Sequence, residues 1–220
     1  MIRVLLVDDH VLVRTGLRML LAGQVDMECV GEADSGEEAL QLVRKTHPDV
    51  VLCDLHMPGL SGLELTERLL KMANAPRVIA VSMQDDGPLP RRVLEAGASG
   101  YVSKSSPAEE LLRAIRDVAR GKRYIGSDIA QALALGSISS SARSPFDGLS
   151  PRELEIVMML VQGIRTNDMA RQLSLSPKTV STHKYRLLRK LGLQDVMSLA
   201  RLASQHGLLD QAHTLTAQAD

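Results

Sequence analysis

The sequence is poor in aromatic residues and in cysteine, and both shortages limit what the chain can be. Aromatic residues make up 2% of the 220 residues, with no Trp, three Tyr and one Phe, so the cores must consist of aliphatic side chains and Met. The two cysteines, Cys29 and Cys53, show no metal-binding spacing. Cys53 lies inside an apolar run, where we expect a small buried residue. So few cysteines favour a reducing cytoplasm.

Long apolar runs and an excess of charge of one sign are also absent. No segment could span a bilayer, and there is no secretory start, so we expect a cytoplasmic protein without a membrane partner. The formal net charge is zero, yet residues 165–190 contain seven Lys or Arg and one Asp, a local charge of +6. Such a basic segment in a neutral protein indicates a partner that carries phosphates.

Four short apolar runs in the first half of the chain end in side chains suited to metal or phosphate chemistry. In parallel sheets, functional groups gather beyond the carboxyl ends of the strands. One such residue alone is more simply a solvated loop charge, but the conjunction is hard to obtain by chance. The runs are Val50–Cys53 before Asp54, Ile2–Val7 before Asp8 and Asp9, Arg77–Val81 before Ser82, and Gly100–Ser103 before Lys104.

Helical periodicity separates these runs, with Ser35 and Ser61 at helix starts and Glu38 and Glu64 in capping-box positions. Continuous rather than alternating apolar residues are typical of strands covered on both faces. Five strands in alternation with helices up to about residue 120 predict an α/β fold, a doubly wound five-stranded parallel sheet.

These residues resemble the receiver domain of bacterial two-component response regulators, a CheY- and flavodoxin-like fold, over residues 1–122. The resemblance implies that Asp54 is the phosphoacceptor. It also implies that Asp9, Asp54 and the backbone carbonyl of His56 bind Mg²⁺ directly, and that Asp8 acts largely through water. The chemistry is consistent, because crowded carboxylates repel one another and a hard dication relieves that repulsion.

The same resemblance gives roles to three further residues. Lys104 would balance the charge on the phosphoryl oxygens, and Ser82 would donate a hydrogen bond to one of them. Tyr101 would be an aromatic switch that changes rotamer on phosphorylation, although a plain strand aromatic is the simpler alternative. We expect that switch to reshape the surface of the fourth helix, fifth strand and fifth helix.

A low-complexity stretch divides the chain after the predicted receiver. A short helix over residues 128–135 precedes a Ser-rich run over 136–145, which is typical of a flexible linker. We therefore expect a linker with a short helix at 123–146, a second domain at 147–212 and a tail at 213–220.

The second domain is predicted to contain four helices, and the first has Ser150, Pro151 and Glu153 in a capping-box pattern. Two short helices joined by a tight turn, with basic residues on the second, suggest a helix-turn-helix, and a plain four-helix bundle with a solvated charged face is the alternative. The predicted helices span residues 151–162, 166–173, 177–191 and 195–206.

Three segments resemble the LuxR-type DNA-binding domain over about 147–210: residues 149–153, 176–180 and 190–192. With a receiver in front, the chain resembles a NarL/FixJ-type response regulator, and details at 121–125, 144–147 and 184–186 resemble the GacA/UvrY branch. The third helix would then enter the DNA groove, with basic residues on phosphates and hydroxyls on bases or phosphates. The expected DNA contacts are Lys178, Thr179, Ser181, Thr182, Lys184, Tyr185 and Arg189.

The function expected from this resemblance is a transcriptional regulator, not an enzyme, that accepts a phosphoryl group on Asp54. Its partners would be a sensor histidine kinase, double-stranded promoter DNA, a second copy on activation and RNA polymerase. One alternative is a phosphate-independent DNA-binding regulator with a vestigial receiver. Another is an Asp-nucleophile phosphohydrolase, but enzymes of the haloacid dehalogenase type carry a second acid where this chain has His56.

Overall fold

The computed structural model describes residues 1–83, 88–139, 145–173 and 175–206. The expected tail at 213–220, residues 140–144 of the expected linker, and Ser174 in the predicted turn lie outside these ranges. The described residues form two compact units, one built around a sheet and one made of helices. Within the described part of the chain, no helix has the length and apolar character needed to cross a membrane.

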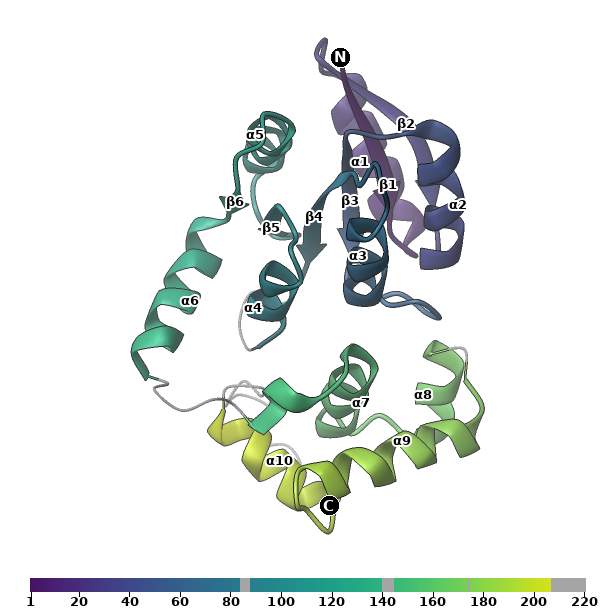
Figure 1. Cartoon of the computed structure of the whole chain (residues 1–220), viewed down its shortest axis with the longest axis vertical. Helices are drawn as coiled ribbons and strands as arrows, with labels where there is room; N and C mark the ends of the chain where they lie inside the picture. The colour runs from purple at the N-terminus through teal and green to yellow at the C-terminus, as the bar shows by residue number, and fades with distance from the viewer. Residues whose placement is uncertain (84–87, 140–144, 174, 207–220) are drawn as a thin grey trace. The chain divides into compact units, whose positions relative to one another are not determined.

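The first unit contains a parallel sheet in the order β2-β1-β3-β4-β5-β6 (Figure 1). β1 lies between β2 and β3, with Val7 opposite Cys53, and β4 lies between β3 and β5, with Val81 opposite Asp54. The parallel fold class predicted from the sequence is confirmed. The strands are β1 (Ile2–Val7), β2 (Met27–Ala33), β3 (Val50–Asp54), β4 (Arg77–Ser82), β5 (Gly100–Ser103) and β6 (Tyr124–Ile125).

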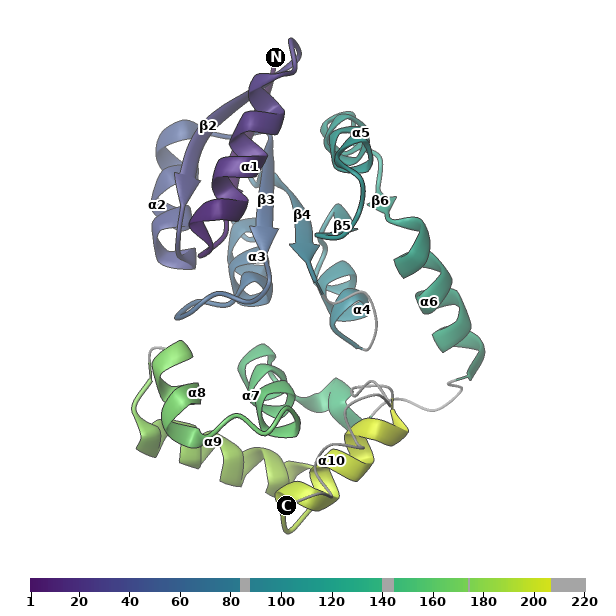
Figure 2. The ribbon, with the colours of Figure 1, turned by 180° about the vertical axis from the view of Figure 1, so that it is seen from behind.

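Alternate residues of β1, β3 and β4 enter separate cores on the two faces of the sheet. Val4 and Leu6 of β1 pack in a core with residues of α1 and α5, while Leu5 and Val7 pack with residues of α2 and α3. Figure 2 shows α1 against the sheet from behind. This double covering explains why the strands are continuously apolar. The helices are α1 (Val11–Ala22), α2 (Gly36–Thr46), α3 (Gly62–Leu70), α4 (Pro88–Glu95) and α5 (Ala108–Ala119).

Three local predictions were wrong. The sheet has six strands, because Tyr124–Ile125 pairs with β5 through hydrogen bonds from Tyr124 N to Ser99 O and from Gly126 N to Tyr101 O. Ser35 occupies the N-cap position of α2 but its side chain makes no capping hydrogen bond, and the Glu38 carboxylate accepts from Asp34 N rather than from Ser35 N, so the predicted capping box does not form. The short helix, α6 (Ser127–Ser139), continues past residue 135 through Gly136 into the Ser-rich run that was expected to be linker.

In the second unit, the described residues form a short 3-10 helix, η1 (Pro145–Gly148), and four α-helices around an aliphatic and Met-rich core. At the start of α7, Ser150 accepts from Glu153 N while Glu153 Oε2 accepts from Ser150 N, so the predicted capping box is confirmed. The single Phe of the chain, Phe146, is fully buried in this core, with His206 edge-on to its ring. The helices are α7 (Pro151–Val161), α8 (Thr166–Gln172), α9 (Pro177–Lys190) and α10 (Val196–Gln205).

Candidate functional site

Three carboxylates meet at the carboxyl edge of the sheet. Asp54 ends β3, and Asp8 and Asp9 follow β1, which pairs with β3 up to Val7 and Cys53. Neighbouring parallel strands therefore deliver the three side chains to one place. Asp8 is 2% exposed and Asp54 4%, so their charges are largely removed from water.

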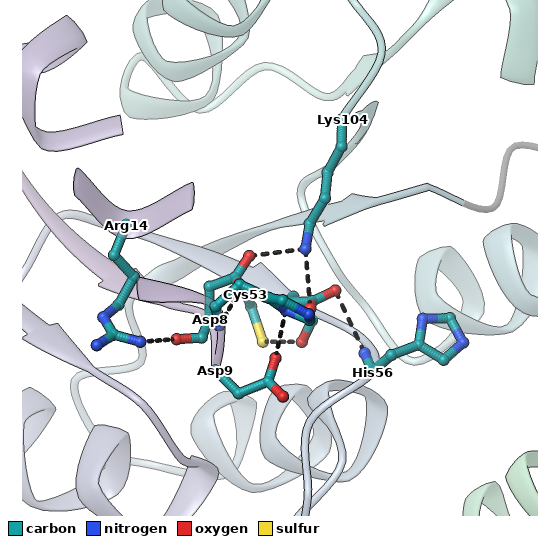
Figure 3. A network of polar contacts seen from close by, with 8 residues as sticks. Asp8, Asp9, Arg14, Cys53, His56 and Lys104 are labelled. Carbon is teal, nitrogen blue, oxygen red and sulfur yellow. Dashed lines mark hydrogen bonds and ion pairs between the residues drawn. The ribbon is translucent and has the colours of Figure 1, made fainter. Parts of the chain in front are cut away.

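Lys104 lies between the two buried carboxylates. Its Nζ is 2.7 Å from Asp8 Oδ2 and 2.9 Å from Asp54 Oδ2 (Figure 3). The backbone N–H of Lys104 donates to Ser82 O at 2.8 Å, which fixes the end of β5 beside that of β4. The structure thus brings together four residues that are far apart in the sequence and that were each predicted to follow an apolar strand: Asp8, Asp54, Ser82 and Lys104.

The buried charges shift one another's protonation equilibria. Burial is the largest influence on Asp54 and, with the nearby Asp8 carboxylate, raises its pKa, although Lys104 opposes the shift. Burial by itself would lower the pKa of Lys104, but its hydrogen bonds with Asp8 and Asp54 outweigh burial and raise that pKa. Lys104 is consequently held as a cation between the two carboxylates.

Ser82 and Tyr101 are the two other residues expected at this site, and both are fully buried. Ser82 ends β4 opposite Ser103, and Tyr101 lies on β5 between Ala80 and Ile125 of the adjacent strands. Tyr101 is therefore a core aromatic in this conformation rather than a half-buried one.

The acidic cluster has the composition and spacing of a divalent-cation site. Ligand atoms of Asp8, Asp9, His10 and Asp54 lie within 4.8 Å of one another. Carboxylate oxygens are the ligands that Mg²⁺ prefers, and it commonly completes its shell with water. Asp9 Oδ1 is buried without a hydrogen-bond partner, which leaves its lone pairs available to a cation. The described residues therefore fit Mg²⁺.

His56 and Cys53 flank Asp54 with different roles. The backbone N–H of His56 donates to Asp54 Oδ1 at 3.3 Å, while the imidazole is exposed and points away from the carboxylates (Figure 3). This orientation leaves the ring unsuited to activating water beside Asp54. The Cys53 thiol is fully buried, and that burial raises its pKa strongly, so it is an unreactive core residue as predicted.

Sequence reasoning missed two residues that contact the acidic pair. His10 Nδ1 lies 2.9 Å from Asp9 Oδ1, and the Arg14 guanidinium donates to the backbone carbonyl of Asp8. His10 could have been predicted as a site residue because it directly follows Asp8 and Asp9 in the sequence. Arg14 is one helical turn further along α1, a spacing that puts both residues near the same strand end.

The predicted DNA-contact residues lie on α9, whose buried side consists of Val180, Leu187 and Leu188. The hydroxyls of Ser181 and Thr182 donate to backbone carbonyls one turn earlier, and Thr179 Oγ1 lies 2.7 Å from the Ser176 hydroxyl. Lys184 and Thr179 are half-buried, whereas Arg186, which was not predicted, is exposed. The exposed predicted residues are Lys178, Ser181, Thr182, Tyr185 and Arg189.

Four of the exposed residues form one stripe along α9. Lys178, Thr182, Tyr185 and Arg189 follow one another at intervals of four, three and four residues, which places them on one face of a helix. Tyr185 is 66% exposed, which is a large value for an aromatic side chain. Nothing in the described part of the chain covers its ring. The stripe offers two cations, one hydroxyl and one aromatic ring to a ligand.

Two protein families match the two units separately. The response regulator receiver domain matches residues 4–116, and the luxR family of bacterial regulatory proteins matches residues 147–203. The described site lies in the first match and α9 lies in the second.

Known proteins also match the chain over nearly its full length. The response regulator GacA of Pseudomonas aeruginosa is 46% identical over 96% of this chain and 100% of its own, and the response regulator UvrY of Escherichia coli K12 is 45% identical over 99% and 100%. Among solved structures, the response regulator ChrA of a heme-sensing two-component system is 34% identical, covering 94% of this chain and 98% of its own with a TM-score of 0.54. A complex of the response regulator RcsB with DNA is 25% identical, covering 92% and 98% with a TM-score of 0.59.

Proposed function

The chain belongs to the two-component response regulators that carry a LuxR-type DNA-binding domain, and we propose that phosphoryl transfer to Asp54 controls DNA binding through α9. The observation that carries this proposal is the meeting of Asp8, Asp9, Asp54 and Lys104 at one sheet edge, in a chain that also has a basic helix-turn-helix. The donor would be a sensor histidine kinase.

Phosphoryl transfer to Asp54 uses groups already in place. A carboxylate oxygen of Asp54 attacks phosphorus, the bond from phosphorus to the donor histidine nitrogen breaks, and an aspartyl-phosphate forms. Lys104 can exchange its bond with Asp54 for one with a phosphoryl oxygen, while Asp8 still holds it. Asp8, Asp9, Asp54 and the His56 carbonyl would hold Mg²⁺, which neutralises charge during transfer.

The fully buried Ser82 and Tyr101 form the proposed route from phosphate to surface. Ser82 would donate to a phosphoryl oxygen, and its movement would leave space into which the Tyr101 ring turns. The active arrangement would then favour a dimer that matches symmetric half-sites on promoter DNA, with RNA polymerase as a further partner. We place the protein in the cytoplasm, where sensor kinases present their phosphorylated histidine.

The stripe on α9 is the proposed groove-facing surface. Lys178 at the helix start and Arg189 near its end would contact phosphates, and Thr182 and Tyr185 lie between them for base edges or phosphates. Lys184 is half-buried and lies on the side of α9 that carries Val180 and Leu188, so we expect a smaller contribution from it than from Arg189.

Replacement of Arg189 tests this surface. Arg189→Ala should weaken binding to a labelled duplex of random sequence and reduce the slope of log K against log salt by about 1, because one phosphate contact is lost. Fluorescence anisotropy over a salt series measures both quantities. Lys190→Ala is the matched control, because it removes the same charge one residue away, from an ammonium that is 2.8 Å from Glu153 Oε2. Equal salt slopes for the two variants would show that Arg189 does not contact DNA phosphates.

The whole proposal is tested on the unaltered chain. Incubation with acetyl phosphate and Mg²⁺ should add one phosphoryl group by intact mass and strengthen binding to DNA. Chelation with EDTA should prevent the addition. Full DNA affinity without phosphoryl addition would instead favour a phosphate-independent regulator. The hydrolase alternative is disfavoured because the His56 ring points away from Asp54 (Figure 3).

A further inference from the structure

His10 places an imidazole against the carboxylates of the proposed cation site. Its backbone N–H donates to Asp8 Oδ1 at 2.8 Å, a local turn that fixes the residue beside the acidic pair. Although it occupies the N-cap position of α1, its side chain makes no capping hydrogen bond. The imidazole is therefore not used to complete the helix.

The spacing of His10 and the carboxylates suits a shared ion. Nδ1 of His10 lies 2.9 Å from Asp9 Oδ1 and 3.4 Å from Asp8 Oδ1. Despite this closeness, Asp9 Oδ1 has no hydrogen bond of acceptable geometry among the described residues. In an octahedral shell with bonds of about 2.1 Å, adjacent ligand atoms are about 3 Å apart and opposite ones about 4.2 Å. The two separations from His10 Nδ1 are close to that of adjacent ligand atoms, and all four candidate ligand atoms lie within 4.8 Å of one another.

We propose that His10 Nδ1 is a nitrogen ligand of the divalent cation held by Asp8, Asp9 and Asp54, and that it gives the site a preference for borderline transition metals such as Co²⁺ over Mg²⁺. Imidazole nitrogen binds such metals well, whereas Mg²⁺ favours oxygen. The proton of the ring would reside on Nε2, toward solvent, because the His10 side chain is 67% exposed. This inference rests on the cation site of the proposed function.

Calorimetry separates the role of His10 from that of the carboxylates. His10→Ala should lower the affinity of the full chain for Co²⁺ about tenfold and change the affinity for Mg²⁺ less than about twofold, because only the nitrogen ligand is lost. His56→Ala is the matched control, since that ring points away from the cluster and its backbone carbonyl is retained (Figure 3). Asp9→Asn should weaken the binding of both metals.

Pulsed electron paramagnetic resonance with Mn²⁺ gives a direct readout. Coupling from a directly bound nitrogen should be present in the unaltered chain and in His56→Ala, and absent in His10→Ala. Unchanged Co²⁺ affinity in His10→Ala, with no nitrogen coupling in the unaltered chain, would overturn the role of His10 alone. Equal Mg²⁺ binding by the unaltered chain and Asp9→Asn would overturn the cation site itself, and with it the phosphoryl-transfer proposal.

Discussion

Asp54→Ala is expected to take up no phosphoryl group from acetyl phosphate and Mg²⁺ under conditions in which the unaltered chain gains one. The substitution removes the nucleophilic oxygen, and no neighbouring group can take its place at the end of β3. Asp8 is held by Lys104 at 2.7 Å and by the His10 backbone N–H at 2.8 Å. The expected change is a complete loss rather than a slower reaction, because the acceptor atom itself is missing.

Intact-mass spectrometry over a time course measures this loss directly. Asp34→Ala is the control, because it removes an exposed carboxylate of the same unit that takes no part in the cluster. Both variants should keep the far-ultraviolet circular dichroism of the unaltered chain. If Asp54→Ala still gained a phosphoryl group, another side chain would be the acceptor, and peptide mapping would identify that residue. Equal DNA affinity before and after phosphoryl addition would show that phosphorylation of Asp54 does not control DNA binding by the helix-turn-helix.

The site could be predicted because its residues mark strand ends. Asp54 and Lys104 each follow a continuous apolar run, and such runs are recognisable in one sequence. Parallel strands place their carboxyl ends at one edge, so the runs predicted that Asp8, Asp54 and Lys104 share that edge, while their closeness depends on the order of the strands in the sheet. Their distances required the structure, because side-chain directions depend on the register of β1, β3 and β5.

Features fixed by a few tertiary contacts could not be predicted in the same way. β6 has two residues, too few to show a period, and it exists because Tyr124 and Gly126 donate to backbone carbonyls around β5. The Ser35 prediction used residue spacing alone, while the Glu38 carboxylate has a choice of backbone donors at the helix start. On α9, the predicted contact set included Lys184, which is half-buried, and left out Arg186, which is exposed.

Gly62→Ala should destabilise the first unit by about 3 kcal/mol, although alanine is the better helix former. Gly62 begins α3, and its N–H donates to Leu55 O at 3.2 Å, which brings the two backbones together just after Asp54. An alanine methyl group there would overlap the Asp54 carbonyl oxygen and lie 2.7 Å from Leu55 Cα. These are backbone atoms, so relief of the overlap requires movement of the segment that carries the phosphoacceptor.

Gly16→Ala provides the opposite expectation within the same unit. Gly16 is an exposed residue of α1, and an added methyl group would meet no atom within 4 Å. This substitution should stabilise the chain by roughly 0.5–1 kcal/mol, because alanine loses less conformational entropy on helix formation. Urea unfolding followed by circular dichroism measures both variants, which suits a chain without Trp.

The opposite signs separate helix propensity from backbone crowding. If Gly62→Ala unfolds only at raised urea, as expected of Gly16→Ala, the approach of α3 to Asp54 must relax without cost. If Gly62→Ala folds but is destabilised, its phosphoryl uptake should also be slower than that of Gly16→Ala, because the displaced carbonyl belongs to Asp54. The close approach of α3 would then position Asp54 for phosphoryl transfer as well as stabilise the first unit.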